Sequence, residues 1–316
     1  MAKKSNRHGK QKGRLSTSYS LSFGKFGPKY VLEAGSVSDI ERYQRNADAV
    51  AAFNWKFYAE LAYQRSQIEG ELVVALSRAA TGPSRFDRWQ RAVKWKYSLD
   101  PLNTLGSIQY GGGRFNAGTI DPKLFPIFPA LYITEDKDTA LQETLGQSAL
   151  QDAHLLAREI ALTAPQSESL ISVSGEVETI IDLSHSENLQ PFVDLLAEIK
   201  IPPYLHHDAK KLGIGPLDVV KTTDELIGNL LQPTWRELPQ VVDVPANCQL
   251  FGQLVRSAGI GGILYPSKFT DKKCLVLYPQ NFENTSSYIE LDDEGPENVS
   301  LKRIDKSNWR LTQETL

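Results

Sequence analysis

The 316-residue sequence has only two cysteines, one methionine and no long hydrophobic run. A membrane-spanning helix needs about 18 or more consecutive apolar residues, so a membrane protein is not expected. Cys248 and Cys274 stand far apart and outside any Cys-x-x-Cys pair, which argues against a disulfide framework and a zinc site. No apolar stretch follows the basic start of the chain, so we expect no secretory signal and a cytoplasmic protein.

No sign of charge dominates either, since 35 Lys and Arg residues stand against 38 Asp and Glu residues, a net charge of −3. This balance excludes a globally basic nucleic-acid binder. The hydrophobic share of 41% and the charged share of 23% are typical of a packed domain. Residues 1–14 do gather six basic side chains without an acid, a pattern that can neutralise phosphates. No aromatic residue interleaves with these charges, so we expect residues 1–35 to be a flexible, solvated tail and nucleic acid not to be a partner.

Several familiar catalytic signatures are missing. The sequence has no Gly-x-x-x-x-Gly-Lys-[Ser/Thr] phosphate loop, no His-Glu-x-x-His metal motif and no Gly-x-Ser-x-Gly around Ser267. His206 and His207 are adjacent, so their side chains point in different directions in regular structure. We therefore expect no bound metal.

The pattern of apolar residues divides the chain. From Ser38 the spacing is helical to about Ala80, with Ser38 and Glu41 in capping-box positions, and an aromatic segment follows up to Tyr97. This predicts a helical N-terminal region over residues 36–97. Beyond Asp100 predicted strands (131–134, 179–183, 262–265, 275–278) alternate with predicted helices (136–145, 191–199, 223–231, 247–258). The mixture predicts an α+β domain over residues 98–285, followed by an acidic tail over 286–316.

Three local sequences carry candidate chemistry. In Gly111-Gly112-Gly113-Arg114-Phe115-Asn116 the glycines allow a close backbone approach, and the planar fork of the arginine suits phosphate or carboxylate. Glu143 lies towards the end of a predicted helix, where its carboxylate can face a cleft. The segment 262–267 is a predicted strand that ends in Tyr-Pro-Ser, and Pro266 cannot continue a central ladder, so Ser267 falls at a strand mouth. Each segment also has an ordinary structural interpretation. The glycine-rich segment can be a surface turn, Glu143 can lie on a solvated helix face, and Ser267 can be a turn residue.

Taken together, these segments resemble the RES domain, a family named for an arginine, a glutamate and a serine. The matching stretches are GGGRFNAG (111–118), ALYITEDKDTALQE (130–143), GILYPS (262–267) and LVLYPQNF (275–282). The similarity spans about residues 98–283. The resemblance implies a mixed α/β catalytic domain like that of ADP-ribosyltransferase toxins, with NAD as a substrate and no cofactor. It also implies a toxin that an antitoxin protein neutralises.

The resemblance also implies roles for single residues. Arg114 would grip the phosphates of NAD, Tyr132 would line the nicotinamide side, and Glu143 would be the catalytic carboxylate; these three form the predicted catalytic set. Ser267 would hold the nicotinamide ribose or a phosphate, and Gly113 and Asn116 complete the predicted NAD-binding residues. The chain departs from the family pattern at residues 119–128, which lengthen the path from Arg114 to Tyr132. It departs again in the long stretch from about 146 to 245.

Three functions remain open at this level. The first is cleavage of the nicotinamide–ribose bond by an NAD glycohydrolase or phosphorylase. The second is ADP-ribosylation of a specific macromolecule, in which the ADP-ribose is transferred to a target and is not released. The third is a non-catalytic interaction or nucleic-acid-binding protein. The sequence leaves open the acceptor, the antitoxin and whether the chain forms a homo-oligomer.

Overall fold

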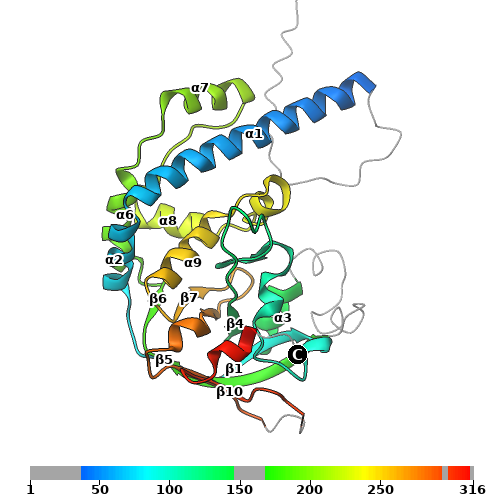
Figure 1. Ribbon diagram of the computed structural model, residues 1–316, viewed down its shortest axis with the longest axis vertical. Helices are drawn as coiled ribbons and strands as arrows, with labels where there is room; N and C mark the ends of the chain where they lie inside the picture. The colour runs from blue at the N-terminus through cyan, green and yellow to red at the C-terminus, as the bar shows by residue number, and fades with distance from the viewer. Residues whose placement is uncertain (1–36, 146–167, 294–297, 314–316) are drawn as a thin grey trace, which may run out of the picture. The chain divides into compact units, whose positions relative to one another are not determined.

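The computed structural model describes residues 37–145, 168–293 and 298–313, so the predicted tail over residues 1–35 lies outside the described residues. The chain divides into two compact units, residues 1–53 with 202–217 and residues 54–201 with 218–316. The first unit holds the start of helix α1 (Val37–Gln67) and helix α7 (Pro203–Leu212). The second unit contains the sheet and the candidate site (Figure 1).

An eight-stranded sheet forms the base of the second unit in the part of the chain that the structure describes (Figure 1). The strand order is β10-β9-β5-β1-β4-β8-β7-β6, and every neighbouring pair is antiparallel except β6 and β7. The strands are β1 (Ser84–Lys94), β4 (Leu131–Thr134), β5 (Glu168–Val177), β6 (Ile180–Asp182), β7 (Gly262–Pro266), β8 (Lys273–Leu277), β9 (Tyr288–Leu291) and β10 (Arg303–Ile304). A separate two-stranded hairpin pairs β2 (Gly112–Gly113) with β3 (Asn116–Ala117).

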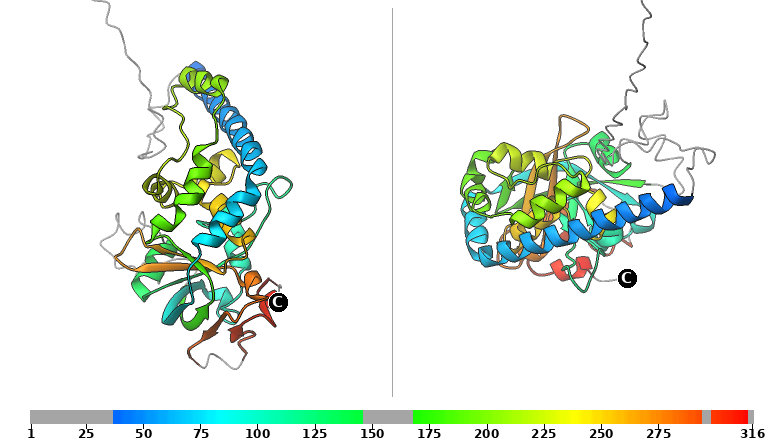
Figure 2. Two further views of the ribbon diagram at one scale, coloured as in Figure 1. Left: turned by 90° about the vertical axis from the view of Figure 1, so that its left-hand side faces the viewer. Right: turned by 90° about the horizontal axis from the view of Figure 1, so that it is seen from above.

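Four helices of this unit pack together and against the sheet (Figures 1 and 2). They are α2 (Glu69–Ala79), α6 (Gln190–Ala197), α8 (Thr223–Leu230) and α9 (Asn247–Ser257). In α9 the buried Phe251, Leu254 and Val255 recur at helical spacing and form one apolar face. Helix α3 (Lys137–Leu145) follows β4 directly. Within the ranges described, every helix is too short or too polar to cross a bilayer.

The two faces of the sheet carry different hydrophobic cores. Along β8, Cys274 and Val276 join the core formed with the helices, whereas Leu275 and Leu277 join the core on the other face. This alternation follows from the two-residue period of a strand. In β4 the flanking residues Leu131 and Ile133 belong to the second core, so Tyr132 is directed to the helix face.

The predicted fold class is confirmed, since helices precede a mixed α/β unit with a mostly antiparallel sheet. The predicted strands and helices after residue 130 recur as β4, α3, β6, α6, α8, α9, β7 and β8, with ends shifted by up to two residues.

The predicted boundary at residue 97 needs correction. Residues 84–94, which the sequence pattern assigned to the helical region, form β1 between β5 and β4 in the middle of the sheet. The register of β1 shifts between Phe86 and Trp89, and Arg88 has a φ of 54°. Across this bulge the rings of Phe86 and Trp89 contact each other although they stand three residues apart in the sequence. That spacing is also typical of a helix, so it hid the strand.

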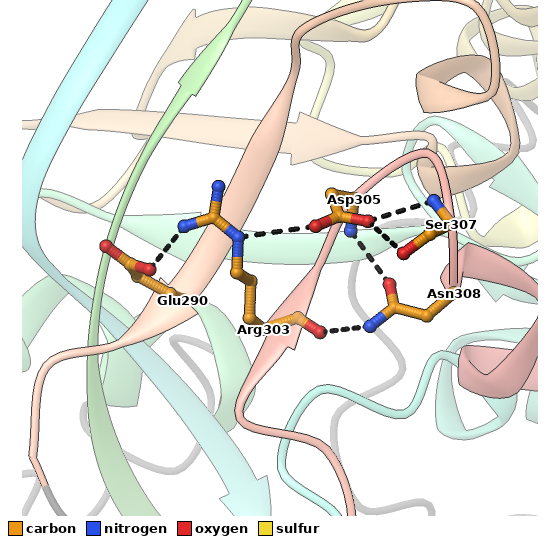
Figure 3. Close-up of polar contacts among 5 residues, drawn as sticks. All are labelled: Glu290, Arg303, Asp305, Ser307 and Asn308. Atoms are coloured by element: carbon orange, nitrogen blue, oxygen red, sulfur yellow. Dashed lines mark hydrogen bonds and ion pairs between the residues drawn. The ribbon is translucent and has the colours of Figure 1, made fainter.

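The predicted acidic tail is corrected as well, because the chain after residue 286 supplies two strands. Ile289 of β9 and Ile304 of β10 are fully buried. Figure 3 shows the acidic side chains beside them: the guanidinium of Arg303 lies between Glu290 and Asp305, and Asn308 donates to the carbonyl of Arg303 at 2.8 Å. Each of these exposed ion pairs contributes at most about 1 kcal/mol, so burial of the two isoleucines stabilises this part of the fold more than the ion pairs do.

Candidate functional site

A cavity of about 410 Å³ opens on the helix face of the sheet. Its walls come from β1, β4, α3, the glycine-rich turn at 112–114, residues 233–236 and the connection from β7 to β8. Arg114, Tyr132 and Glu143 all line this cleft. The fold thus brings the three predicted catalytic residues to one place although they come from a turn, a strand and a helix.

The glycine-rich turn is compact because side chains would not fit in it. Gly112 has a φ of 97°, and a Cβ on Gly113 would lie 2.5 Å from the hydroxyl of Tyr132. Asn116 is fully buried behind the turn. Its Oδ1 accepts hydrogen bonds from the amide of Gly113 at 3.0 Å and from the hydroxyl of Tyr132 at 2.8 Å. Gly113 therefore lines the cleft, and Asn116 positions the residues that do.

The ring of Tyr132 lines the cleft, and its hydroxyl forms hydrogen bonds with the protein. The hydroxyl donates to Asn116 and accepts the amide of Phe115 at 3.0 Å. Burial raises the pKa of Tyr132, so the phenol stays neutral at physiological pH. These two hydrogen bonds fix the ring of Tyr132, which forms an aromatic wall of the cleft.

Arg114 is anchored on one side. Its Nη1 donates to the carbonyls of Leu230 at 3.2 Å and Gln232 at 3.0 Å, and its guanidinium carbon lies 5.7 Å from the ring centre of Trp235. Within the described residues Nε and Nη2 have no hydrogen-bond partner, so they are available to an anion.

Glu143 is held by the turn that follows β7. The hydroxyl of Ser267 donates to Glu143 Oε1 at 2.7 Å, and the amide of Phe269 donates to that hydroxyl at 3.1 Å. The thiol of Cys274 lies 3.7 Å from the same carboxylate oxygen. Burial and the nearby carboxylate raise the pKa of Cys274, so the thiol stays protonated and can donate. Ser267 thus reaches the site through the carboxylate of Glu143.

Positive charge exceeds negative charge around the cleft. The charged lining residues are Arg91, Lys94, Arg114, Arg236 and Lys268 against Glu143 and Glu168. The buried Arg91 donates to the carbonyls of Pro101, Asn103 and Tyr132, and burial lowers its pKa to about 10, which leaves it charged at neutral pH. The cleft is therefore suited to an anionic ligand. Among the residues described, no group of three or more His, Cys, Asp or Glu side chains converges as metal ligands do.

Gln249 is a residue of the site that sequence reasoning missed. It lies in the first turn of α9, is 1% exposed, and its Nε2 contacts the carbonyls of Gly111, Gly113 and Asn116 at 2.7, 3.1 and 3.1 Å. Its Oε1 accepts the amide of Ala246 at 3.0 Å. One amide thus holds the glycine-rich turn against α9. The only signal in the sequence is a glutamine in the first turn of a predicted helix, which also describes an ordinary cap.

We expect Gln249→Met to lower both stability and ligand affinity. The thioether fills the space but donates no hydrogen bond, and each buried carbonyl left without a donor costs about 1–3 kcal/mol. Thermal melting and ligand titration measure the two effects, with Gln240→Met as the control because Gln240 is exposed. A Gln249→Met protein that melts and binds like wild type would show that the amide does not hold the turn.

Comparison with known proteins identifies the family to which the chain belongs. A model of the RES domain family matches residues 85–296, a range that contains Arg114, Tyr132, Glu143, Gln249 and Ser267. Among solved structures, a chain of the M. tuberculosis MbcT–MbcA toxin–antitoxin complex is similar, with 16% sequence identity, a TM-score of 0.39, and coverage of 77% of this chain and 97% of that chain. No curated protein matches the chain. Because the family model covers more than half of the sequence, the chain belongs to the RES domain family.

Proposed function

We propose that this protein consumes NAD by cleaving the bond between nicotinamide and ribose, as a toxin-type member of its family. The observation that carries the proposal is the carboxylate of Glu143, fixed by Ser267 in the same cationic cleft as Arg114 and the ring of Tyr132. NAD has the matching parts: a diphosphate for the cations, a flat nicotinamide for the aromatic wall, and a ribose whose reaction creates positive charge.

The chemistry follows from where charge develops. As the C1′–N bond breaks, its electron pair leaves with nicotinamide, and C1′ and the ribose ring oxygen become positive. A carboxylate beside them stabilises this oxocarbenium-like state, as in glycoside hydrolysis. Within the described residues, both side-chain hydrogen bonds to Glu143 fall on Oε1, so in this proposal Oε2 faces the ribose. When the acceptor oxygen bonds to C1′, Oε2 can also take its proton.

The acceptor distinguishes three versions of the reaction. Water yields ADP-ribose, inorganic phosphate yields a phosphorylated ADP-ribose, and a macromolecule becomes ADP-ribosylated. In each version nicotinamide is released, so the proposal for bond cleavage does not depend on the acceptor.

We expect the purified protein to release nicotinamide from NAD. The experiment incubates it with NAD, with and without inorganic phosphate, and identifies the products by mass spectrometry. A Glu143→Gln protein purified in the same way is the control for contaminating activity. Absence of nicotinamide release both with and without phosphate would contradict cleavage with water or phosphate as the acceptor, and equal release by the control would contradict the role of Glu143 in the proposal.

Depletion of NAD harms the cell that makes such an enzyme. We therefore also propose a partner antitoxin and a cytoplasmic location, where NAD is used. Expression of the wild-type chain alone should arrest growth, and expression of the Glu143→Gln chain should not. The family membership and the NAD-compatible cleft support this proposal, and the growth comparison tests it.

A further inference from the structure

We infer that Arg236, from the long segment between α3 and α9, is a second anion-binding arm of the cleft and holds the substrate diphosphate together with Arg114. The identity of the substrate as a dinucleotide rests on the proposed function. The anion-binding role of Arg236 stands on the geometry of the cleft.

The two arginines share one indole. Trp235 lines the cavity and is only 2% exposed, so its ring is fixed by the core. The guanidinium carbon of Arg114 lies 5.7 Å from the centre of that ring, and that of Arg236 lies 4.5 Å from it. The two guanidinium groups are therefore no farther apart than the sum of these distances. Stacking on an indole orients a guanidinium and leaves its N–H groups free at the edge.

The arginines that line the cleft differ in how many hydrogen bonds their guanidinium groups make to the protein. Arg91 gives hydrogen bonds to three carbonyls. Arg114 gives Nη1 to two carbonyls. The side chain of Arg236, which lines the cavity, makes no hydrogen bond or ion pair within the described residues. It is the lining arginine with the most donors available to a ligand.

The charges around Arg236 favour an anion between the two arms. Burial and the positive charge of Arg114 lower the pKa of Arg236, while the negative charge of Glu143 raises it. Two guanidinium groups that repel each other gain most from a ligand with more than one negative charge. A diphosphate presents two linked phosphoryl groups, and each can accept a paired hydrogen bond from one guanidinium.

Arg114 also holds the segment that carries Arg236. Its hydrogen bonds to the carbonyls of Leu230 and Gln232 tie that segment to the glycine-rich turn. Loss of Arg114 should therefore disturb both arms, whereas loss of Arg236 removes one. We expect Arg114→Gln to weaken diphosphate binding more than Arg236→Gln.

The test is calorimetric titration with ADP, which carries the diphosphate, and with nicotinamide riboside, which does not. Arg236→Gln should weaken ADP binding by about 10- to 100-fold, the value of a charge-assisted hydrogen bond, and leave nicotinamide riboside binding unchanged. Arg236→Lys should restore part of the affinity, because it keeps the charge but loses the planar fork. The control is Arg310→Gln: Arg310 also follows a tryptophan and stacks on it at 4.7 Å, but it lies outside the cleft.

The outcomes separate this inference from the proposed function. Equal ADP affinity of wild type and a folded Arg236→Gln protein overturns the inference, even where NAD is consumed. Absence of ADP binding by wild type overturns it too. ADP binding that depends on Arg236 in a protein that releases no nicotinamide from NAD supports the inference and contradicts the proposed function.

Discussion

Replacement of Glu143 by glutamine should lower NAD turnover by about 10²–10³-fold and leave the fold intact. The transition state carries positive charge that the bound substrate's ribose lacks, so the carboxylate acts on the barrier and not on binding. Glutamine keeps the volume, and its Oε1 can still accept the hydroxyl of Ser267, which donates to Glu143 at 2.7 Å. The substitution therefore removes the negative charge but keeps the side-chain volume and the hydrogen bond from Ser267. Initial rates of nicotinamide release and thermal melting measure the two expectations.

Two comparisons sharpen this experiment. Glu135→Gln is the matched control, because Glu135 is half-buried and accepts the amide of Lys273 at 3.1 Å but does not line the cleft; its turnover should stay near wild type. Arg114→Ala should raise KM as well, since the phosphates are charged in the ground and transition states alike. A folded Glu143→Gln protein that consumes NAD at nearly the wild-type rate would refute the role assigned to Glu143.

Replacement of Gly252 by alanine should destabilise the protein, although alanine normally favours a helix by about 1 kcal/mol over glycine. Gly252 lies within α9, where a Cβ would come 2.1 Å from the carbonyl oxygen of Phe115 and 2.8 Å from the hydroxyl of Tyr278. That carbonyl is backbone and cannot move alone. Overpacking of this kind costs about 1–3 kcal/mol or more, so we expect a net loss of roughly 2 kcal/mol and a melting temperature lower by about 4–8 °C.

Gly228→Ala is the control for the effect of Gly252→Ala. Gly228 lies in α8, and a Cβ there would meet nothing within 4 Å, so this change should stabilise the protein by up to about 1 kcal/mol. Gly252→Ala should also weaken ligand binding, because Phe115 adjoins Arg114 in the glycine-rich turn. A Gly252→Ala protein as stable as Gly228→Ala would show that α9 does not need its close approach to that turn.

Local periodicity predicted the elements that carry Tyr132, Glu143 and Ser267, because each is flanked by apolar residues with one clear period. β4 alternates between two cores, and α3 buries Ala140 and Leu141. The family resemblance, resting on short motifs with their flanking strands and helices, then supplied the expectation that these residues belong together. The structure places Arg114, Tyr132 and Glu143 in one cleft with Ser267 bonded to Glu143; their chemical roles stay predictions.

Other parts of the fold and of the site could not be predicted from the local sequence pattern. The bulge at Arg88 disguised β1, and β9 was hidden because its one buried residue, Ile289, stands between the half-buried Tyr288 and Glu290. Gln249 contacts residues more than a hundred positions away, for example Gly111 at 2.7 Å. No local period records such a contact. This contact becomes visible only once the glycine-rich turn and α9 lie side by side.

The strand order has a consequence for how the protein is made. β4, which carries Tyr132, pairs with β8 through Leu131 and Leu277, and β8 in turn pairs with β7. The cleft cannot assemble until the ribosome has released Leu277, because Glu143 also needs Ser267, and the turn needs Gln249. Chains grow at about 5–20 residues per second, and long-range strand pairing is slow. We therefore expect a nascent chain to lack the assembled cleft until at least β8 has been synthesised.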